Sequence, residues 1–177
     1  RRRARLAEAS AALVAEYESA TNTQFLVSYN PRTGAERGRV KLGGDPRGTL
    51  LNADASRLYV AHSFSNDVYV IDPRNLATLA IIPVGLKPFG LALDENAHRL
   101  YVTNYESDSL SVINTDTNQI AGTIPLAMMP TAWEVNETMQ RAYVANASSD
   151  SVFVIEGARV IKEIGVGRHP TDLARDA

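Results

Sequence analysis

The chain has 177 residues, 45% of them hydrophobic and 21% charged, which is enough for one ordinary domain with a buried core. Its formal net charge of −2 gives no basic excess, and no apolar stretch approaches the roughly 18 residues that cross a membrane, so we expect neither a nucleic-acid partner nor a transmembrane segment. The absence of cysteine excludes disulfides, thiol catalysis, cysteine zinc sites and covalent haem attachment.

The first part of the chain is predicted to be helical. Residues 4–20 are rich in Ala, Leu and Glu and contain no Gly or Pro. Their helical spacing produces one narrow apolar stripe of Leu6, Leu13, Val14 and Tyr17. We therefore assign residues 1–23 to a short N-terminal helix and linker, which either docks beside the following domain or binds a partner.

The chain starts with Arg1 rather than Met, which favours a processed or truncated piece of a longer protein. An export signal needs an uninterrupted apolar segment near its start. Glu8 and Glu16 interrupt that segment, so we expect no signal peptide here.

From Phe25 onward, a repeat of about 42 residues governs the sequence. Leu58-Tyr59-Val60-Ala61 recurs as Leu100-Tyr101-Val102-Thr103 and as Ala142-Tyr143-Val144-Ala145, and prolines recur at the same step at Pro46, Pro88 and Pro130, with Pro170 following after 40. Each repeat divides into four short strands, A to D, and the proline opens strand A. Fixed periods of about 40–50 residues that contain several strands indicate propeller blades.

We therefore predict an all-β fold, a β-propeller segment over residues 24–177 with three full four-stranded blades at about 43–85, 86–127 and 128–167. Partial blades are predicted at 24–42, which would supply strands C and D only, and at 168–177, which would begin a strand A. Such ends are typical of a closed ring in which strands from both termini together form one blade. Three ways of completing the ring stay open: the rest of a longer chain, another copy or protein subunit, or a small four-bladed ring that lacks one strand.

The repeats resemble the YVTN-type β-propeller family over roughly residues 25–173. Tyr101-Val102-Thr103-Asn104 matches the motif in full, and Tyr143-Val144-Ala145-Asn146 departs from it by one residue. The Pro-x-Gly openings at Pro46 and Pro88 also look like the family. The resemblance implies a periplasmic or extracellular location and a binding or scaffold role, and some such propellers are attached to redox proteins.

Positions that are identical among the repeats are expected to maintain the fold, whereas positions that differ can encode a specific surface. The differing positions are the residue after the opening proline, one position within strand A, the last residue of the YVTN motif, and the residue that comes directly after this motif. Trp, Tyr and Arg dominate interface energetics, which guides the choice among them. Our candidates for contact with a partner or ligand are Arg47, His62, Phe89, Tyr105 and Trp133. Ordinary packing variation is the alternative explanation.

No catalytic constellation can be recognised in the sequence. The histidines, His62, His98 and His169, occupy three different repeat positions, so no metal site is predicted. There is no dinucleotide loop, P-loop or nucleophile elbow, and we predict no cofactor and no catalytic residue.

These observations favour a non-catalytic β-propeller module that mediates protein–protein interaction or scaffolding in an exported or membrane-associated assembly. The alternative is an accessory domain of a redox enzyme, or a propeller that binds a small ligand at the channel mouth.

Overall fold

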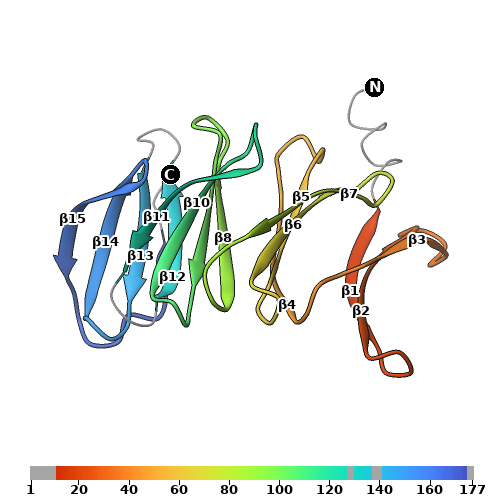
Figure 1. Cartoon of the computed structure of the whole chain (residues 1–177), viewed down its shortest axis with the longest axis horizontal. Helices are drawn as coiled ribbons and strands as arrows, with labels where there is room; N and C mark the ends of the chain where they lie inside the picture. Colours follow the sequence, from red (N-terminus) through yellow and green to blue (C-terminus); the bar gives the residue numbers. More distant parts are fainter. Residues whose placement is uncertain (1–10, 127–129, 137–140, 175–177) are drawn as a thin grey trace.

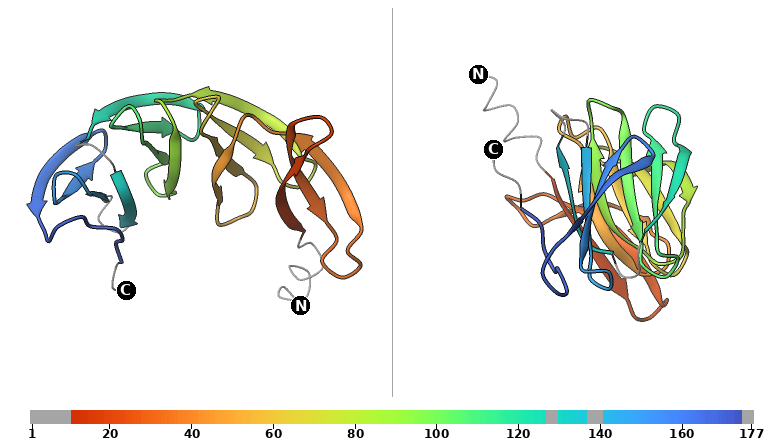
Figure 2. Two further views of the ribbon diagram at one scale, coloured as in Figure 1. Left: turned by 90° about the horizontal axis from the view of Figure 1, so that it is seen from below. Right: turned by 90° about the vertical axis from the view of Figure 1, so that its left-hand side faces the viewer.

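The protein consists of four antiparallel sheets that stand side by side in chain order. The structure is a computed structural model that describes residues 11–126, 130–136 and 141–174, with the main chain only for residues 131–136. Within this part, fifteen strands form one sheet of three strands and three sheets of four (Figure 1). Viewed from below, the row of sheets bends into an open arch (Figure 2). The predicted all-β class is therefore confirmed, and the small four-bladed ring is not the arrangement of this chain.

Each sheet is a meander in which consecutive strands are neighbours. The first sheet contains β1 (Ala12–Glu18), β2 (Thr23–Tyr29) and β3 (Glu36–Lys41). The second contains β4 (Pro46–Leu51), β5 (Leu58–His62), β6 (Asp67–Asp72) and β7 (Ala77–Pro83). The third contains β8 (Pro88–Asp94), β9 (Arg99–Asn104), β10 (Ser109–Asn114) and β11 (Gln119–Pro125). The fourth contains β12 (Pro130–Asn136), β13 (Arg141–Asn146), β14 (Ser151–Glu156) and β15 (Arg159–Gly165).

The core lies between the sheets. Each sheet has a front face, turned toward the next sheet in the chain, and a back face, turned toward the preceding one, and successive side chains of a strand alternate between them. The cluster between the second and third sheets contains Tyr59, Ala61, Val68, Val70 and Ile82 from the front face and Leu91, Leu100, Val102 and Ile113 from the back face. The next junction repeats this pattern with Tyr101, Leu110, Val112 and Ile124 against Ala142, Val144 and Ile155. Full burial of each such aliphatic side chain contributes about 1.5–3 kcal/mol.

The prediction of a helix was wrong for the described residues 12–18. They form β1, which pairs along its whole length with β2, from Ala12 opposite Tyr29 to Glu18 opposite Thr23. Helix propensity is a weak preference, and here the edge of β2 outweighs it. Residues 4–10 of the predicted helix lie outside the described residues. The first sheet consequently has three strands, because β1 adds a strand before β2 and β3.

The turn before β2 carries the signal that the sequence-based interpretation missed. Asn22 has a positive φ of 51°, and the same position of the later turns is held by Asn66, Asp108 and Asp150 with φ of 58°, 45° and 52°. Asn and Asp tolerate this left-handed conformation better than most residues. Residues 19–22 therefore form the turn of a β-hairpin, and Thr23 begins β2.

Two irregularities recur among the sheets, one in strand A of the three four-stranded sheets and one in the outer strand of all four. In strand A, the register skips the residue after the opening proline, which is Arg47 in β4 and Phe89 in β8. The outer strand also has one bulge in each sheet, at residues 37, 79, 121 and 161. A β-bulge bends its strand and redirects a side chain. Arg47 and Phe89 thus differ between repeats because the bulge turns them away from the regular pairing.

The described residues after β15, 166–174, form no strand. The predicted strand A at the end of the chain is therefore not formed in this part, and residues 175–177 lie outside the described residues. Within the described residues, no helix has the length and apolar composition needed to span a membrane.

Candidate functional site

One edge of the arch is built from the turns between strands B and C and from the links between successive sheets. The amide of Ser63 donates to the carbonyl of Asp45 at 2.9 Å, and that of Tyr105 donates to the carbonyl of Lys87 at 2.9 Å. The amide of Phe64 likewise donates to the carbonyl of Gly44 at 3.1 Å. Each turn is therefore fixed to the link that precedes its sheet, and this edge is a rigid platform.

Large apolar side chains are exposed along this platform. Phe64 is 72% exposed, and Leu86, Phe89 and Tyr105 are exposed as well; we call these four residues the apolar patch. The Ser63 hydroxyl, beside Phe64, donates to the carbonyl of Pro88, beside Phe89, at 3.0 Å. This buried bond ties two parts of the patch together across the junction between the second and third sheets.

The sequence analysis named Phe89 and Tyr105 but missed Phe64 and Leu86. The signal for Phe64 was present, because the corresponding residues of the later repeats are Glu106 and Ser148. The candidate positions in this turn ended with the residue before it, which is Ser63, Tyr105 or Ala147 in the three repeats. Comparison of every turn position among the repeats would have found it.

Arg47 lies near this platform but is already paired. Its Nε donates to Oδ2 of Asp45 at 2.8 Å, while about half of its side chain stays exposed. A pair at this level of exposure contributes about 0–1 kcal/mol, so it is readily exchanged for another acidic group. Trp133 lies in β12 opposite Val144, and its side chain lies outside the described residues.

His62 differs from the other candidates, because it is fully buried and offers no surface to a partner. Its Nδ1 lies 2.9 Å from Oδ1 of Asp67, and Tyr69 packs edge-on with ring centroids 4.4 Å apart. Burial lowers the pKa of His62 below its usual value, although the neighbouring carboxylate of Asp67 acts in the opposite direction. The Nε2 atom is buried and has no hydrogen-bond partner among the residues that the structure describes.

The corresponding positions of the third sheet hold a different polar cluster. Nδ2 of Asn104 donates to the hydroxyls of Ser109 and Ser111 at 3.1 and 2.9 Å. The second sheet therefore has His62, Asp67 and Tyr69 at the positions where the third sheet has Asn104, Ser109 and Ser111. The variation at position 62 is accompanied by compensating changes in its neighbours, which indicates packing rather than recognition.

The opposite edge of the arch contains two pockets between neighbouring sheets. A cavity of ≈ 500 Å³ lies between the first and second sheets, and its lining includes Leu13, Arg37 and Arg74. A second cavity of ≈ 450 Å³ lies between the second and third sheets, and its lining includes Arg57 and Asp116. Pockets of this size are large enough for small ligands.

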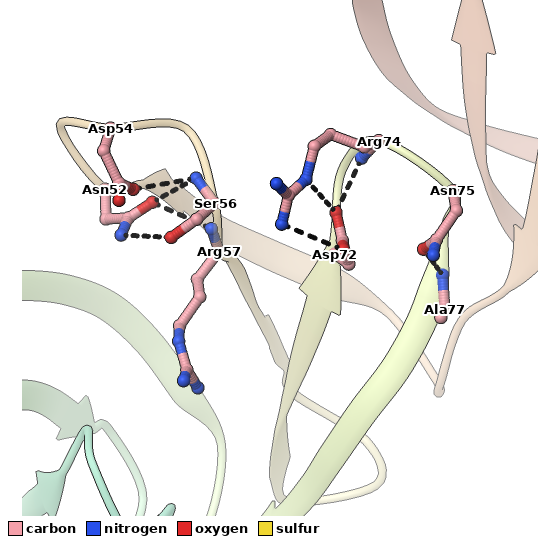
Figure 3. Close-up of polar contacts among 8 residues, drawn as sticks. All are labelled: Asn52, Asp54, Ser56, Arg57, Asp72, Arg74, Asn75 and Ala77. Atoms are coloured by element: carbon pink, nitrogen blue, oxygen red, sulfur yellow. Dashed lines mark hydrogen bonds and ion pairs between the residues drawn. The ribbon is translucent and has the colours of Figure 1, made fainter.

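Most polar groups around these pockets are occupied by contacts within their own turns (Figure 3). Oδ1 of Asn52 accepts the amides of Ser56 and Arg57 at 3.0 and 2.8 Å. Nε and Nη2 of Arg74 donate to the carboxylate of Asp72 at 3.0 and 3.2 Å, which lowers the pKa of Asp72. The side chain of Arg57 instead extends away from its turn (Figure 3).

Two carboxylates beside these pockets, those of Asp54 and Asp72, are not suited to act as general acids. Hydrogen bonds from Ser56 lower the pKa of Asp54, and the arginine beside Asp72 has the same effect, so both carboxylates are ionised at neutral pH. A general acid requires the opposite shift. Within residues 11–126, 130–136 and 141–174, no three His, Asp or Glu side chains are grouped to hold a metal ion.

No protein-family model and no curated protein matches the chain. Among solved structures, it is similar to hydrazine synthase from Kuenenia stuttgartiensis, with a TM-score of 0.68 and 20% identity over 84% of this chain and 47% of that one. It is also similar to the dihydro-heme d1 dehydrogenase NirN in complex with DHE, with a TM-score of 0.69 and 13% identity over 88% of this chain and 38% of that one.

A third similar structure is a functionally unknown protein from Desulfotomaculum acetoxidans, with a TM-score of 0.72 and 10% identity over 93% of this chain and 56% of that one. The chain thus spans between 38% and 56% of these structures. Identities this low show the fold alone, which is that of a β-propeller. Membership of the YVTN family remains a prediction, because it rests on the motifs only.

Proposed function

We propose that this chain is a non-catalytic β-propeller module that binds another protein through the apolar patch. The observation that carries the proposal is the exposure of Phe64, Leu86, Phe89 and Tyr105 along an edge whose turns and links are held together by backbone hydrogen bonds. Rigid aromatic side chains lose little conformational entropy on binding and often provide most of the interface energy. The ion pair between Lys87 and Glu106 lies beside the patch and supplies the polar rim that such interfaces usually have.

The module belongs, in this proposal, to an exported or membrane-associated assembly, as its resemblance to YVTN-type propellers implies. Arg47 adds a charged contact at the margin of the patch, because its pair with Asp45 is exposed and exchangeable.

Site-specific photo-crosslinking tests this proposal. A photoreactive phenylalanine analogue at position 64, 89 or 105, introduced in the source organism, is expected to crosslink to the same protein. The matched control is position 79, where Leu79 is exposed on β7 but lies outside the patch. Purified partner should then bind the Phe64→Ser variant at least about 10-fold more weakly than the wild type. Equal crosslinking from position 79, or an unchanged affinity of the variant, would contradict the proposal.

A second candidate is a small-ligand site in the pocket between the second and third sheets, as in the accessory domain of a redox enzyme. The pocket of ≈ 450 Å³ and the outward-extending Arg57 favour it, and the similar NirN structure was obtained with DHE. Titration with iron protoporphyrin IX, followed by absorbance, tests it. Saturable binding that weakens in Arg57→Ala but not in Arg74→Ala would support it, and non-saturable binding would exclude this ligand.

A further inference from the structure

An arginine and a tyrosine recur together at strand B of the repeats. They are Arg57 and Tyr59 in the second sheet, and Arg99 and Tyr101 in the third. Both tyrosines are only 2% exposed, and the hydroxyl of a buried tyrosine usually finds a hydrogen-bond partner. The two pairs consist of the same residue types but have different surroundings, so the chain contains its own comparison.

In the third sheet, the pair is closed by the main chain of the next sheet. The hydroxyl of Tyr101 donates to the carbonyl oxygen of Gly157 at 3.4 Å. The guanidinium of Arg99 lies against the same residue, because a Cβ built on Gly157 would be 3.7 Å from both Nη atoms. Gly157 belongs to the short turn, residues 157–158, between β14 and β15. This pair therefore contacts a peptide carbonyl that comes from outside its own sheet.

At the junction between the second and third sheets, the corresponding turn is held differently. The turn between β10 and β11 is longer and comprises residues 115–118. It is attached to the A–B turn of its own sheet, because the amide of Thr115 donates to the carbonyl of His98 at 3.0 Å and Nδ1 of His98 lies 3.2 Å from Oδ1 of Asp116. The pocket of ≈ 450 Å³ lies beside the arginine–tyrosine pair of the second sheet, at the position that Gly157 fills at the next junction.

The donors of this pair are consequently free to bind a ligand. Arg57 and Tyr59 both line the pocket, and Arg57 extends away from its turn (Figure 3). Within the part of the chain that the structure describes, neither the hydroxyl of Tyr59 nor the guanidinium of Arg57 has a hydrogen-bond partner. The guanidinium is a planar fork of donors that matches the two oxygens of a carboxylate. The pocket therefore offers a carboxylate site where the next junction holds a carbonyl oxygen.

The third sheet contributes an acidic wall to the same pocket. Glu95 and Asp116 line it from this sheet, and Asp54 lines it from the second sheet. Oε1 of Glu95 accepts the amide of Ala53 at 2.5 Å, whereas its Oε2 has no partner among the described residues. One free guanidinium beside several carboxylates is complementary to a ligand that carries a carboxylate at one end and ammonium groups elsewhere.

We propose that this pocket binds a free basic amino acid, whose α-carboxylate is held by Arg57 and Tyr59 and whose ammonium groups lie toward Glu95 and Asp116. The α-carboxylate takes the place that the carbonyl of Gly157 has at the next junction. The inference rests on the second candidate function, because it names the class of ligand for the same pocket. It does not depend on the apolar patch.

Titration with L-lysine, followed by isothermal calorimetry and by NMR of the labelled protein, tests the proposal. Saturable binding of one lysine per chain is expected, with shifted amide signals around the pocket. The control ligand is cadaverine, which is lysine without its carboxylate, and it should bind at least about 10-fold more weakly because it offers no acceptor to the guanidinium. Equal binding of cadaverine, or no binding of lysine, would overturn the proposal.

Two tyrosine variants provide a matched comparison at the same repeat position. Tyr59→Phe removes a hydroxyl that has no partner among the described residues, so it should leave the melting temperature of the free protein unchanged. It should nevertheless weaken lysine binding at least about 5-fold. Tyr101→Phe removes the hydroxyl that contacts Gly157 and should leave lysine binding unchanged. An unchanged affinity of Tyr59→Phe, or an equal loss in both variants, would overturn the assignment.

A parallel titration with iron protoporphyrin IX separates this inference from the second candidate function. Lysine binding that is lost in Arg57→Ala but kept in Arg74→Ala, without any binding of the porphyrin, would support the ligand class proposed here. Porphyrin binding through Arg57 without any binding of lysine would keep the pocket as a site but overturn this ligand class.

Discussion

Asp67 holds the imidazole of His62 across the hairpin of β5 and β6, with Oδ1 2.9 Å from Nδ1, at a position where the third sheet places a serine against an asparagine. Because Nδ1–H donates to the carboxylate, the lone pair of the buried Nε2 atom faces no donor within the described part of the chain. The second sheet therefore contains a histidine whose pKa is lowered by burial, at a site where the third sheet holds an asparagine and serines, which do not titrate.

The stability of the protein is expected to depend on pH through His62. Burial lowers its pKa in the folded state below the ordinary value of 6.5. The unfolded chain therefore binds the proton first, and stability that is present above pH 6.5 is lost as the pH falls from there toward the pKa of the folded state. The loss is about 1.4 kcal/mol for each unit by which the pKa is lowered.

Urea unfolding between pH 7.5 and 5.5 measures this dependence. The double variant His62→Asn/Asp67→Ser, which introduces the residue types of Asn104 and Ser109 of the third sheet, should show a smaller loss than the wild type. His98→Asn is the control, because the side chain of His98 is exposed. An unchanged slope in the double variant would contradict the assignment.

Gly48 is expected to tolerate no side chain. A Cβ at this position would lie 2.5 Å from the carbonyl oxygen of Phe89, which is main chain of the next sheet and cannot rotate away. Gly48→Ala should therefore lower the free energy of unfolding by about 1–3 kcal/mol. Gly165→Ala, where nothing lies within 4 Å, should change it by less than about 0.5 kcal/mol in the same urea titration. Similar values for the two variants would refute the close approach.

Two isoleucines of the same strand test the junction between the third and fourth sheets. Ile124 is buried in the cluster between these sheets, whereas Ile120, also in β11, is exposed. Ile124→Ala is expected to cost about 2–5 kcal/mol in chemical unfolding, because it leaves a cavity. Ile120→Ala should cost less than about 1 kcal/mol. Equal costs would mean that the junction is not packed as described.

A turn residue offers a stabilising substitution. Ala55 is exposed in the turn between β4 and β5 and has a φ of 54°, a conformation that costs an L-residue energy but is free for glycine. Ala55→Gly should raise the free energy of unfolding by about 0.5–1 kcal/mol, measured as a rise in the melting temperature. Ala53→Gly, in the same turn but without a positive φ, should lower it slightly. A lower melting temperature for Ala55→Gly would contradict the assigned turn conformation.

Much of the strand arrangement was predictable from the repeats. Alternation of side chains and turn residues are local properties, so the strands from Pro46 to Gly165 could be read from three aligned copies. Even the shorter turn after Glu156 was visible, because the third copy lacks two residues there. The candidate site was harder to predict from the sequence, because variation between the repeats selected the exposed Phe89 and the buried His62 alike.

By itself, the sequence determined the β-propeller fold and the position of each repeated strand, because those depend on the order of neighbouring residues. Only the tertiary structure decided that residues 12–18 pair as β1 instead of coiling, that His62 is enclosed by Asp67 and Tyr69, and that Val14 and Ile164 stay uncovered. Each of these outcomes depends on which distant segment lies alongside, and burial and strand pairing are set by that contact rather than by the identity of the residue.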